Sequence, residues 1–170
     1  MHTMDKEQYK GIQVFAEQRE GVVQNVAFEL IGKARELADS IGEKVTAVLL
    51  GQNVANLSQE LIAAGADRVL LVEHDLLKDY VTEQYAQAIT HILNTHKPEI
   101  FLLGATTIGR DLGPRLSARM HTGLTADCTS LEINEDRNLL MTRPAFGGNL
   151  MATIICKEHR PQMSTVRPGV

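Results

Sequence analysis

Arginines gather toward the carboxyl-terminal end of the chain, and they are the side chains whose chemistry is easiest to interpret. Seven of the ten arginines lie between Gly104 and Val170, where 8 Lys and Arg accompany 6 Asp and Glu. Residues 1–103 carry 9 basic and 15 acidic side chains instead. Because a guanidinium group pairs with carboxylates and phosphates through two parallel hydrogen bonds, it suits ion pairs at interfaces. We therefore expect residues 104–170 to carry a contact surface.

A short glycine-containing segment at the start of this region could bind an anion. Gly104 to Gly109 has the GxxxxG spacing of a phosphate loop, but Arg110 and Asp111 stand where Lys and Ser or Thr would contact phosphate and magnesium. A helix that begins after a strand can still bind an anion through its free backbone amides. Nucleotide or flavin contact near Thr106 therefore remains open, beside the alternative of a kinked surface helix.

No set of residues with a recognisable catalytic pattern is found. The sequence has no GxGxxG dinucleotide loop, no GxSxG nucleophile elbow and no HExxH metal motif. Several carboxylates lack a partner base or nucleophile in the sequence, namely Asp111, Asp127, Glu132 and Glu158. We therefore expect no catalytic residue and no metal, and we predict that the chain is not an enzyme by itself.

Composition limits the class of protein. The 170 residues suit a single domain over residues 1–170, and we expect residues 1–10 to form a poorly ordered start. Aromatic residues make up 4% of the chain and Trp is absent, so there is little material to stack on nucleic-acid bases. Because no apolar run approaches the about 18 residues of a membrane span and no signal peptide is visible, we expect a cytoplasmic protein without membrane insertion. Cys128 and Cys156 lack metal-ligand spacing and are expected to be free thiols.

Short apolar runs alternate with helical periodicity in the first part of the chain. The expected strands are Ile12 to Phe15, Val45 to Leu50, Val69 to Val72 and Ile100 to Leu103. Between them we expect three helices: one that ends at Gly42, one capped by Asn53 and one capped by Asp79. This order predicts a doubly wound, mostly parallel α/β sheet, a three-layer sandwich of the nucleotide alpha-hydrolase or flavodoxin-like type.

The pattern changes after Gly104. Thr106 or Thr107 can cap a fourth helix, although Gly109, Gly113 and Pro114 are unusual inside a helix. Strands and turns follow, at Thr129 to Ile133, Leu139 to Met141, Leu150 to Cys156 and Gln162 to Val166. We predict that these strands form an antiparallel carboxy-terminal extension.

Four motifs in this order resemble the alpha subunit of electron transfer flavoprotein. They are GRDLGPR at 109–115, GLTADC at 123–128, TRPAFGGN at 142–149 and RPQMSTVRPGV at 160–170. The 170 residues are similar to the amino-terminal domain of that subunit. The resemblance implies an alpha/beta heterodimer that carries electrons between flavin dehydrogenases, such as acyl-CoA dehydrogenases, and an acceptor.

The resemblance also implies where the cofactor and the partner bind. The main FAD would lie in a carboxy-terminal domain that this sequence lacks, so no flavin is expected to bind tightly to this chain alone. Residues expected at the interface with the beta subunit are Arg110, Asp111, Arg115, Arg119, Asp127, Arg160 and Arg167. In electron-bifurcating relatives a second FAD lies in the beta subunit, and its expected contacts are Arg143, Phe146, Gly147, Gly148 and Thr106. An exposed interface also predicts self-association of the isolated chain.

Two other functions remain as alternatives. A stand-alone adenine-nucleotide-binding module of the universal-stress type would share this α/β sheet, but it would need a convincing glycine-rich phosphate loop. An enzyme of the nucleotide-hydrolase type would need an acid, a base or a metal set that the sequence does not show. Binding of ATP separates the first alternative from a subunit domain.

Overall fold

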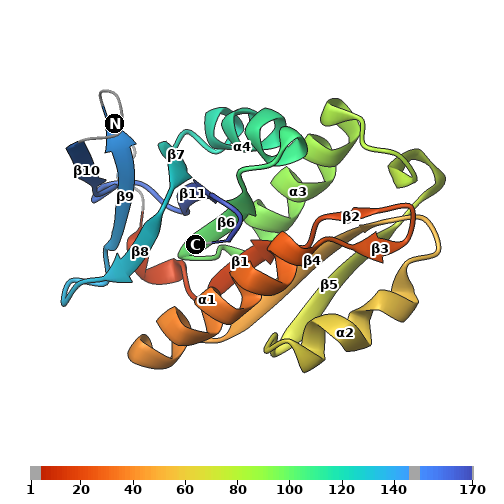
Figure 1. The fold of residues 1–170 in the computed structure, drawn as a ribbon, viewed down its shortest axis with the longest axis horizontal. Coiled ribbons are helices and arrows are strands. Elements are labelled where there is room, and N and C mark those ends of the chain that lie inside the picture. Colours follow the sequence, from red (N-terminus) through yellow and green to blue (C-terminus); the bar gives the residue numbers. More distant parts are fainter. Residues whose placement is uncertain (1–4, 146–149, 170) are drawn as a thin grey trace.

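The computed structural model describes residues 5–145 and 150–169 and contains a central sheet of six parallel strands. In spatial order the strands are β5 (Arg68–Glu73), β4 (Val45–Gly51), β1 (Ile12–Phe15), β6 (Ile100–Gly104), β11 (Gln162–Val166) and β7 (Leu124–Cys128) (Figure 1). β1, β4 and β6 are buried on both faces, as expected for parallel strands covered by helices. The predicted α/β fold class is confirmed.

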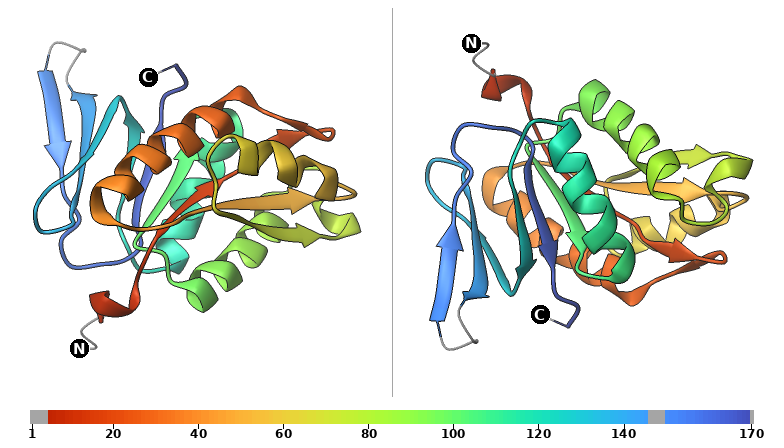
Figure 2. Two further views of the ribbon diagram at one scale, coloured as in Figure 1. Left: turned by 90° about the horizontal axis from the view of Figure 1, so that it is seen from below. Right: turned by 90° about the horizontal axis from the view of Figure 1, so that it is seen from above.

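Two pairs of helices cover the two faces of this sheet (Figure 2). The first hydrophobic cluster joins α1 (Asn25–Ile41) to residues of β1, β4 and β6, and α2 (Ser58–Ala63) belongs to the same layer. The second cluster joins α3 (Thr82–His96) and α4 (Thr107–Arg119) to the opposite side chains of these strands. Gly42 ends α1 in the left-handed conformation at φ 68°, as the sequence predicts.

Two predicted helix caps are wrong. Asn53 has a φ of 55°, whereas an N-cap normally requires an extended backbone. A short 3-10 helix, η2 (Ala55–Leu57), follows Asn53, and α2 begins only at Ser58. Asp79 lies before Val81, which is the N-cap of α3 and offers no side-chain oxygen. The cap predicted at Thr106 is correct, because its side chain accepts a hydrogen bond from the Gly109 amide.

Short elements surround the main layers. Two further 3-10 helices are η1 (Lys6–Gln8) and η3 (Asp75–Leu77), and β2 (Gln18–Arg19) forms a small hairpin with β3 (Val22–Val23). The expectation of a poorly ordered start over residues 1–10 falls partly on residues 1–4, which lie outside the described residues. It stays a prediction.

A separate antiparallel sheet stands beside the central one. It has the order β10 (Leu150–Ile154), β9 (Leu139–Ala145) and β8 (Ser130–Ile133), which confirms the antiparallel part of the predicted extension. One strand of the prediction is wrong, because β11 lies inside the central sheet and pairs in parallel with β6 and β7. β7 was not predicted as a strand. The connection from β7 to β11 therefore uses the antiparallel sheet where the other crossovers use a helix.

Candidate docking and flavin-contact surface

The start of α4 lies where strands β1 and β6 end, at the carboxyl edge of the central sheet. The Thr106 hydroxyl accepts a hydrogen bond from the Gly109 amide at 3.0 Å and donates its proton to Oε1 of Glu17 at 2.5 Å. Glu17 is only 2% exposed, so the chain itself places a carboxylate beside this helix start. A phosphate would meet that negative charge, which disfavours a nucleotide at this position.

Close backbone packing also leaves little room at the start of α4. A Cβ atom added to Gly109 would lie 1.8 Å from the carbonyl oxygen of Gly104. A Cβ atom on Gly113 would lie 3.1 Å from a methyl of Leu124 and 3.2 Å from a methyl of Thr165. The two glycines that seemed unusual in a helix therefore let α4 approach the end of β6, the start of β7 and the side of β11.

Asp127 and Arg167 form a two-point ion pair at the ends of β7 and β11. Nε and Nη2 of Arg167 donate to the two carboxylate oxygens of Asp127 at 3.0 and 2.8 Å. This pairing lowers the pKa of Asp127, and the charges of Arg110 and Arg143 lower it further. The structure thus brings together four of the predicted residues, three basic and one acidic.

A second group of predicted residues joins α4 to α3. Asp111 accepts hydrogen bonds from the hydroxyls of Thr82 and Tyr80, and these bonds lower the pKa of Asp111. Burial raises the pKa of Tyr80 to about 12, and the neighbouring Asp111 carboxylate adds to the effect.

Two more predicted arginines belong to this group. Arg115 and Arg119 both form ion pairs with Glu83 of α3, at 3.1 Å for Arg115. The side chains of Arg115 and Glu83 are 49% and 57% exposed. The group joins α3 to α4 on one helical layer, and such exposed pairs contribute little to stability.

Arg160 lies inside the chain, unlike the other predicted interface arginines. It is 3% exposed, and Nη1 donates to the carbonyl oxygens of Cys156 and His159 at 3.0 and 2.9 Å. Nη2 donates to Oδ1 of Asn138 at 3.2 Å, and burial lowers the pKa of the guanidinium group. Because its bonds hold the loop before β11, we leave Arg160 out of the docking surface proposed below.

Arg137 belongs to the same amino edge of the sheet, where the parallel strands begin. Its Nη2 donates to Oε1 of Glu43 at 2.5 Å and to Oε2 of Glu99 at 3.2 Å. Its Nη1 donates to the carbonyl oxygen of Ile41 at 3.3 Å. The residue thus ties the turn between β8 and β9 to the end of α1 and to the start of β6.

Sequence reasoning missed the apolar surface of β10. Leu150, Met151 and Ile154 are 60%, 55% and 41% exposed, and β10 is the outer strand of its sheet, paired with β9 among the described residues. Successive side chains of a strand point to opposite faces, so β10 exposes apolar groups on both. Three large apolar residues in a five-residue run were the available sequence indication. An exposed apolar edge strand favours pairing with another chain.

The five residues predicted to contact a second flavin fall into three cases. Phe146, Gly147 and Gly148 lie outside the described residues. Thr106 already donates its hydroxyl proton to Glu17, so it has no proton for a flavin. Arg143 pairs in register with Ala152 of β10, which places it between the apolar strand and the Asp127–Arg167 pair.

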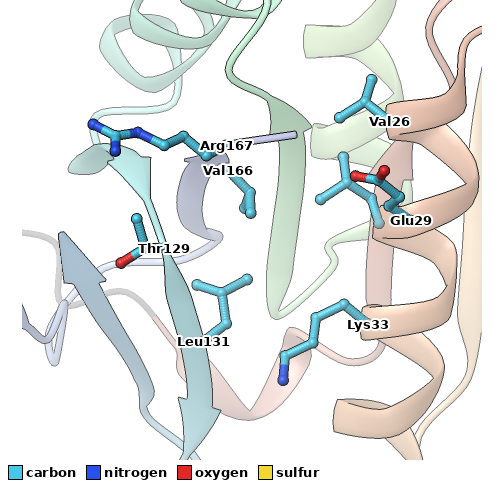
Figure 3. Close-up of a pocket in the computed structure, with 8 residues that line it drawn as sticks. Val26, Glu29, Lys33, Thr129, Leu131, Val166 and Arg167 are labelled. Atoms are coloured by element: carbon cyan, nitrogen blue, oxygen red, sulfur yellow. The ribbon is translucent and has the colours of Figure 1, made fainter. Parts of the chain in front are cut away.

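A small pocket lies between α1 and the antiparallel sheet. Its cavity of about 170 Å³ is lined by Val26, Glu29, Leu30, Lys33, Thr129, Leu131, Val166 and Arg167 (Figure 3). Val26, Leu30, Leu131 and Val166 are all nearly buried and form its apolar floor. Glu29 and Lys33 bring charges to its mouth, whereas the guanidinium group of Arg167 points away from the pocket and pairs with Asp127 of β7.

The described parts of the chain hold neither a cluster of metal-ligating side chains nor a helix that could span a membrane. Among residues 5–145 and 150–169, no group of three or more His, Cys, Asp or Glu side chains could hold a metal ion. None of the described helices is long and apolar enough to cross a membrane. Cys128 and Cys156 are free cysteines, of which Cys128 is buried and Cys156 half-buried.

Comparison with known proteins identifies the family. Residues 12–170 match the model of the electron transfer flavoprotein domain. The electron transfer flavoprotein subunit alpha of Clostridium acetobutylicum is 58% identical over 168 residues, covering 98% of this chain and 50% of that protein. The subunit of the same name from Thermoanaerobacterium thermosaccharolyticum is 61% identical over 162 residues, covering 95% of this chain and 49% of that protein.

A third relative has a different name. The lactate dehydrogenase (NAD(+),ferredoxin) subunit LctC of Acetobacterium woodii is 48% identical over 164 residues, covering 96% of this chain and 39% of that protein. The chain spans about half the length of the first two relatives. Because the family model matches nearly the whole chain, the protein belongs to the electron transfer flavoprotein domain family.

Proposed function

We propose that this chain is the amino-terminal scaffold and docking domain of an electron transfer flavoprotein alpha subunit in the cytoplasm. The observation that supports this most strongly is the family match over residues 12–170, with alpha subunits at 58% and 61% identity. In the proposal the whole protein carries electrons between flavin dehydrogenases, including acyl-CoA dehydrogenases, and an acceptor. It is an electron carrier without a catalytic constellation of its own.

The partner would be a beta subunit, docked on a continuous surface. This docking surface consists of three exposed apolar residues and three arginines. They are Leu150, Met151, Ile154, Arg110, Arg143 and Arg167. Arg143 connects the two parts, since it pairs in register with β10 and its charge acts on Asp127. An apolar centre with arginines around it is the usual composition of a stable interface.

FAD would bind mainly outside the matched half, and this chain would contribute a contact to a second flavin in the beta subunit. FAD, when bound, supplies the electron-accepting and electron-donating chemistry. Arg143 is the residue that fits such a contact, because it is half-buried and no acidic partner satisfies it among the described ion pairs. Its positive charge would stabilise an anionic reduced flavin. The A. woodii relative, whose printed name includes NAD(+) and ferredoxin, supports an electron-bifurcating type.

An adenine-nucleotide module is the weaker candidate. The Glu17 carboxylate and the contact between Gly109 and Gly104 both oppose a phosphate at the start of α4. Calorimetric titration of the chain with ATP and with FAD is expected to show no tight binding of either. Tight ATP binding would support the adenine-nucleotide module and contradict the subunit domain.

Binding to the beta subunit provides the direct test of the docking surface. Met151→Asp should weaken binding at least about tenfold, since it places a charge in the apolar centre. Leu76→Asp is the matched control, because Leu76 is 57% exposed but lies in η3, outside the docking surface. Equal affinity of the two variants in a titration followed by calorimetry would exclude β10 as the docking strand.

The flavin contact needs a separate measurement in the intact heterodimer. Arg143→Ala should lower the potential of the second flavin, because the positive charge that favours its anionic reduced form is removed. Arg115→Ala serves as a control, since Arg115 is paired with Glu83 on the helical layer. An unchanged potential in Arg143→Ala would rule out this contact. Sedimentation of the isolated chain would show whether it self-associates through the same surface.

A further inference from the structure

The last described residues cross from the central sheet to α1 and are held at both ends. Arg167 is fixed to β7 by its two-point pair with Asp127, and its amide donates to the carbonyl oxygen of Cys128 at 2.9 Å. Gly169 is fixed to α1, because its amide donates to Oε2 of Glu29 at 2.8 Å. Residues 167–169 therefore form a strap between two elements that are far apart in sequence.

The strap lies at the mouth of the pocket between α1 and the antiparallel sheet. Arg167 and Glu29, the residues that hold its two ends, both line the pocket (Figure 3). In Figure 3 Lys33 extends from α1 toward Leu131, and Val166 lies between the two walls. The strap thus lies at the rim of an apolar cavity of about 170 Å³.

The relatives indicate what could occupy this cavity. The chain matches 50% and 49% of the two alpha subunits, so about half of each of those proteins lies outside the matched part. The floor of Val26, Leu30, Leu131 and Val166 suits an apolar side chain. The charged side chains of Glu29 and Lys33 at the rim suit the polar backbone around such a side chain.

We propose that this pocket is the seat for an apolar side chain of the segment that follows residue 170 in the full-length alpha subunit. The strap of residues 167–169 delivers that segment to the pocket and fixes the direction in which the chain leaves the domain. The proposal rests on the proposed function, since it requires a longer alpha subunit. An occupied pocket holds the start of the connection to the next domain against α1. The position of that domain is therefore restrained.

Lysine acetylation measured by mass spectrometry tests the seat without any substitution. Lys33 lines the pocket, whereas Lys44 is exposed at the amino edge of the sheet and serves as an internal control. The acetylation rate of Lys33 should be about tenfold lower in the full-length alpha subunit than in residues 1–170, equivalent to ~1.4 kcal/mol in favour of the seated segment. The rate at Lys44 should be the same in both proteins.

Three results would overturn the proposal. Equal acetylation of Lys33 in the two proteins would show that the segment does not cover the pocket. Protection that appears only after the beta subunit is added would assign the pocket to the partner. Protection that survives in both Glu29→Ala and Asp127→Asn would show that the strap does not hold the segment there, because each variant removes one attachment.

The proposed function is monitored independently in the same samples. FAD content and binding of the beta subunit report whether the full-length protein is an electron transfer flavoprotein alpha subunit. If both are normal and Lys33 is not protected, only the seat fails. If FAD and the beta subunit do not bind while Lys33 is protected, the seat stands and the proposed function fails.

Discussion

The two edges of the central sheet both gather charged residues, but they use them differently. At the amino edge Arg160 is 3% exposed and Glu99 is 5% exposed, and Arg137 links Glu99 to Glu43 and to the end of α1. At the carboxyl edge the Arg167 side chain is 46% exposed and its partner Asp127 is 29% exposed. The amino edge therefore buries part of its charge in contacts that hold elements together, whereas the Arg167–Asp127 pair of the carboxyl edge holds residues 167–169 to β7 and also stays within reach of another molecule.

The number of arginines in a region therefore does not locate an interface. Arg137, Arg160 and Arg167 all belong to the arginine-rich part of the sequence, yet only Arg167 extends from the carboxyl edge. Arg160, which is buried, and Arg137, whose side chain is 42% exposed, both serve the fold, because removing either leaves its acceptors without a donor. Four substitutions test this contrast between the two edges, and the loss of stability should decrease from the first to the last.

Gly109→Ala should have the largest effect on the free energy of unfolding. It tests how closely α4 packs at the carboxyl edge. The new methyl group would lie 1.8 Å from the Gly104 carbonyl oxygen, so α4 must shift away from β6. We expect the free energy of unfolding in urea to fall by about 3 kcal/mol. Gly32→Ala in α1 is the matched control, since nothing lies within 4 Å of its added Cβ. A smaller loss in Gly109→Ala than in the control would contradict the close packing.

Arg160→Met should have the next largest effect and tests the holding role of the amino edge. The variant leaves the carbonyl oxygens of Cys156 and His159 and the Asn138 side chain without their donor. We expect a loss of about 2 kcal/mol, measured by urea unfolding. Arg115→Met removes an exposed arginine of the same size and should change stability by less than about 0.5 kcal/mol. Similar losses in both variants would remove the distinction between buried and exposed arginines.

Asp127→Asn tests the carboxyl edge through its dependence on pH. Because Arg167 lowers the folded-state pKa of Asp127 below its unfolded value, the ion pair stabilises the fold at pH values above the unfolded pKa of about 4. This contribution is lost as the pH falls through the folded pKa. The urea midpoint of the variant should therefore be lower than that of the parent chain at pH 7, and the difference should shrink toward pH 3. A difference that does not change with pH would exclude the charge of Asp127 as its cause.

Glu83→Gln should have the smallest effect. Glu83 is 57% exposed and pairs with Arg115 and Arg119 across the helical layer. Because such surface pairs are largely screened by solvent, we expect the free energy of unfolding to stay within about 0.5 kcal/mol of the parent value. Thermal unfolding at low and high salt provides the measurement. A clear loss of stability that disappears in high salt would show that these ion pairs, like the charges of the amino edge, hold the fold together.

The elements that sequence could predict are those defined by local patterns. β1, β4 and β6 are continuous apolar runs, and the αL residue Gly42 ends α1 as expected. β11 was placed in the wrong sheet, because its polar residues Gln162 and Ser164 are fully buried by partners that only the fold provides. Asp127, with a φ of 59°, interrupts the pattern of β7, so that strand was not recognised.

The sequence also predicted only part of the candidate site, because burial and exposure depend on the fold. The four charged residues Asp127, Arg167, Arg110 and Arg143 were selected from motifs, and the fold gathers them near one edge. Burial cannot be read from a motif, so the internal position of Arg160 could not be predicted. The apolar edge of β10 was also missed, because a run such as Leu150 to Ile154 suits a buried strand equally well.

The position of β11 between β6 and β7 has a consequence for synthesis of the protein. Ile100 of β6 pairs with Gln162 of β11, and Leu124 of β7 pairs with Met163 of β11. Both earlier strands can therefore form these pairs only after β11 has been synthesised. On the ribosome, the first four parallel strands can assemble while β7 still lacks its neighbour. Since such long-range pairing is slow, the nascent chain exposes two open strand edges until residues 162–166 emerge. That interval is when we expect the growing polypeptide to need protection by chaperones.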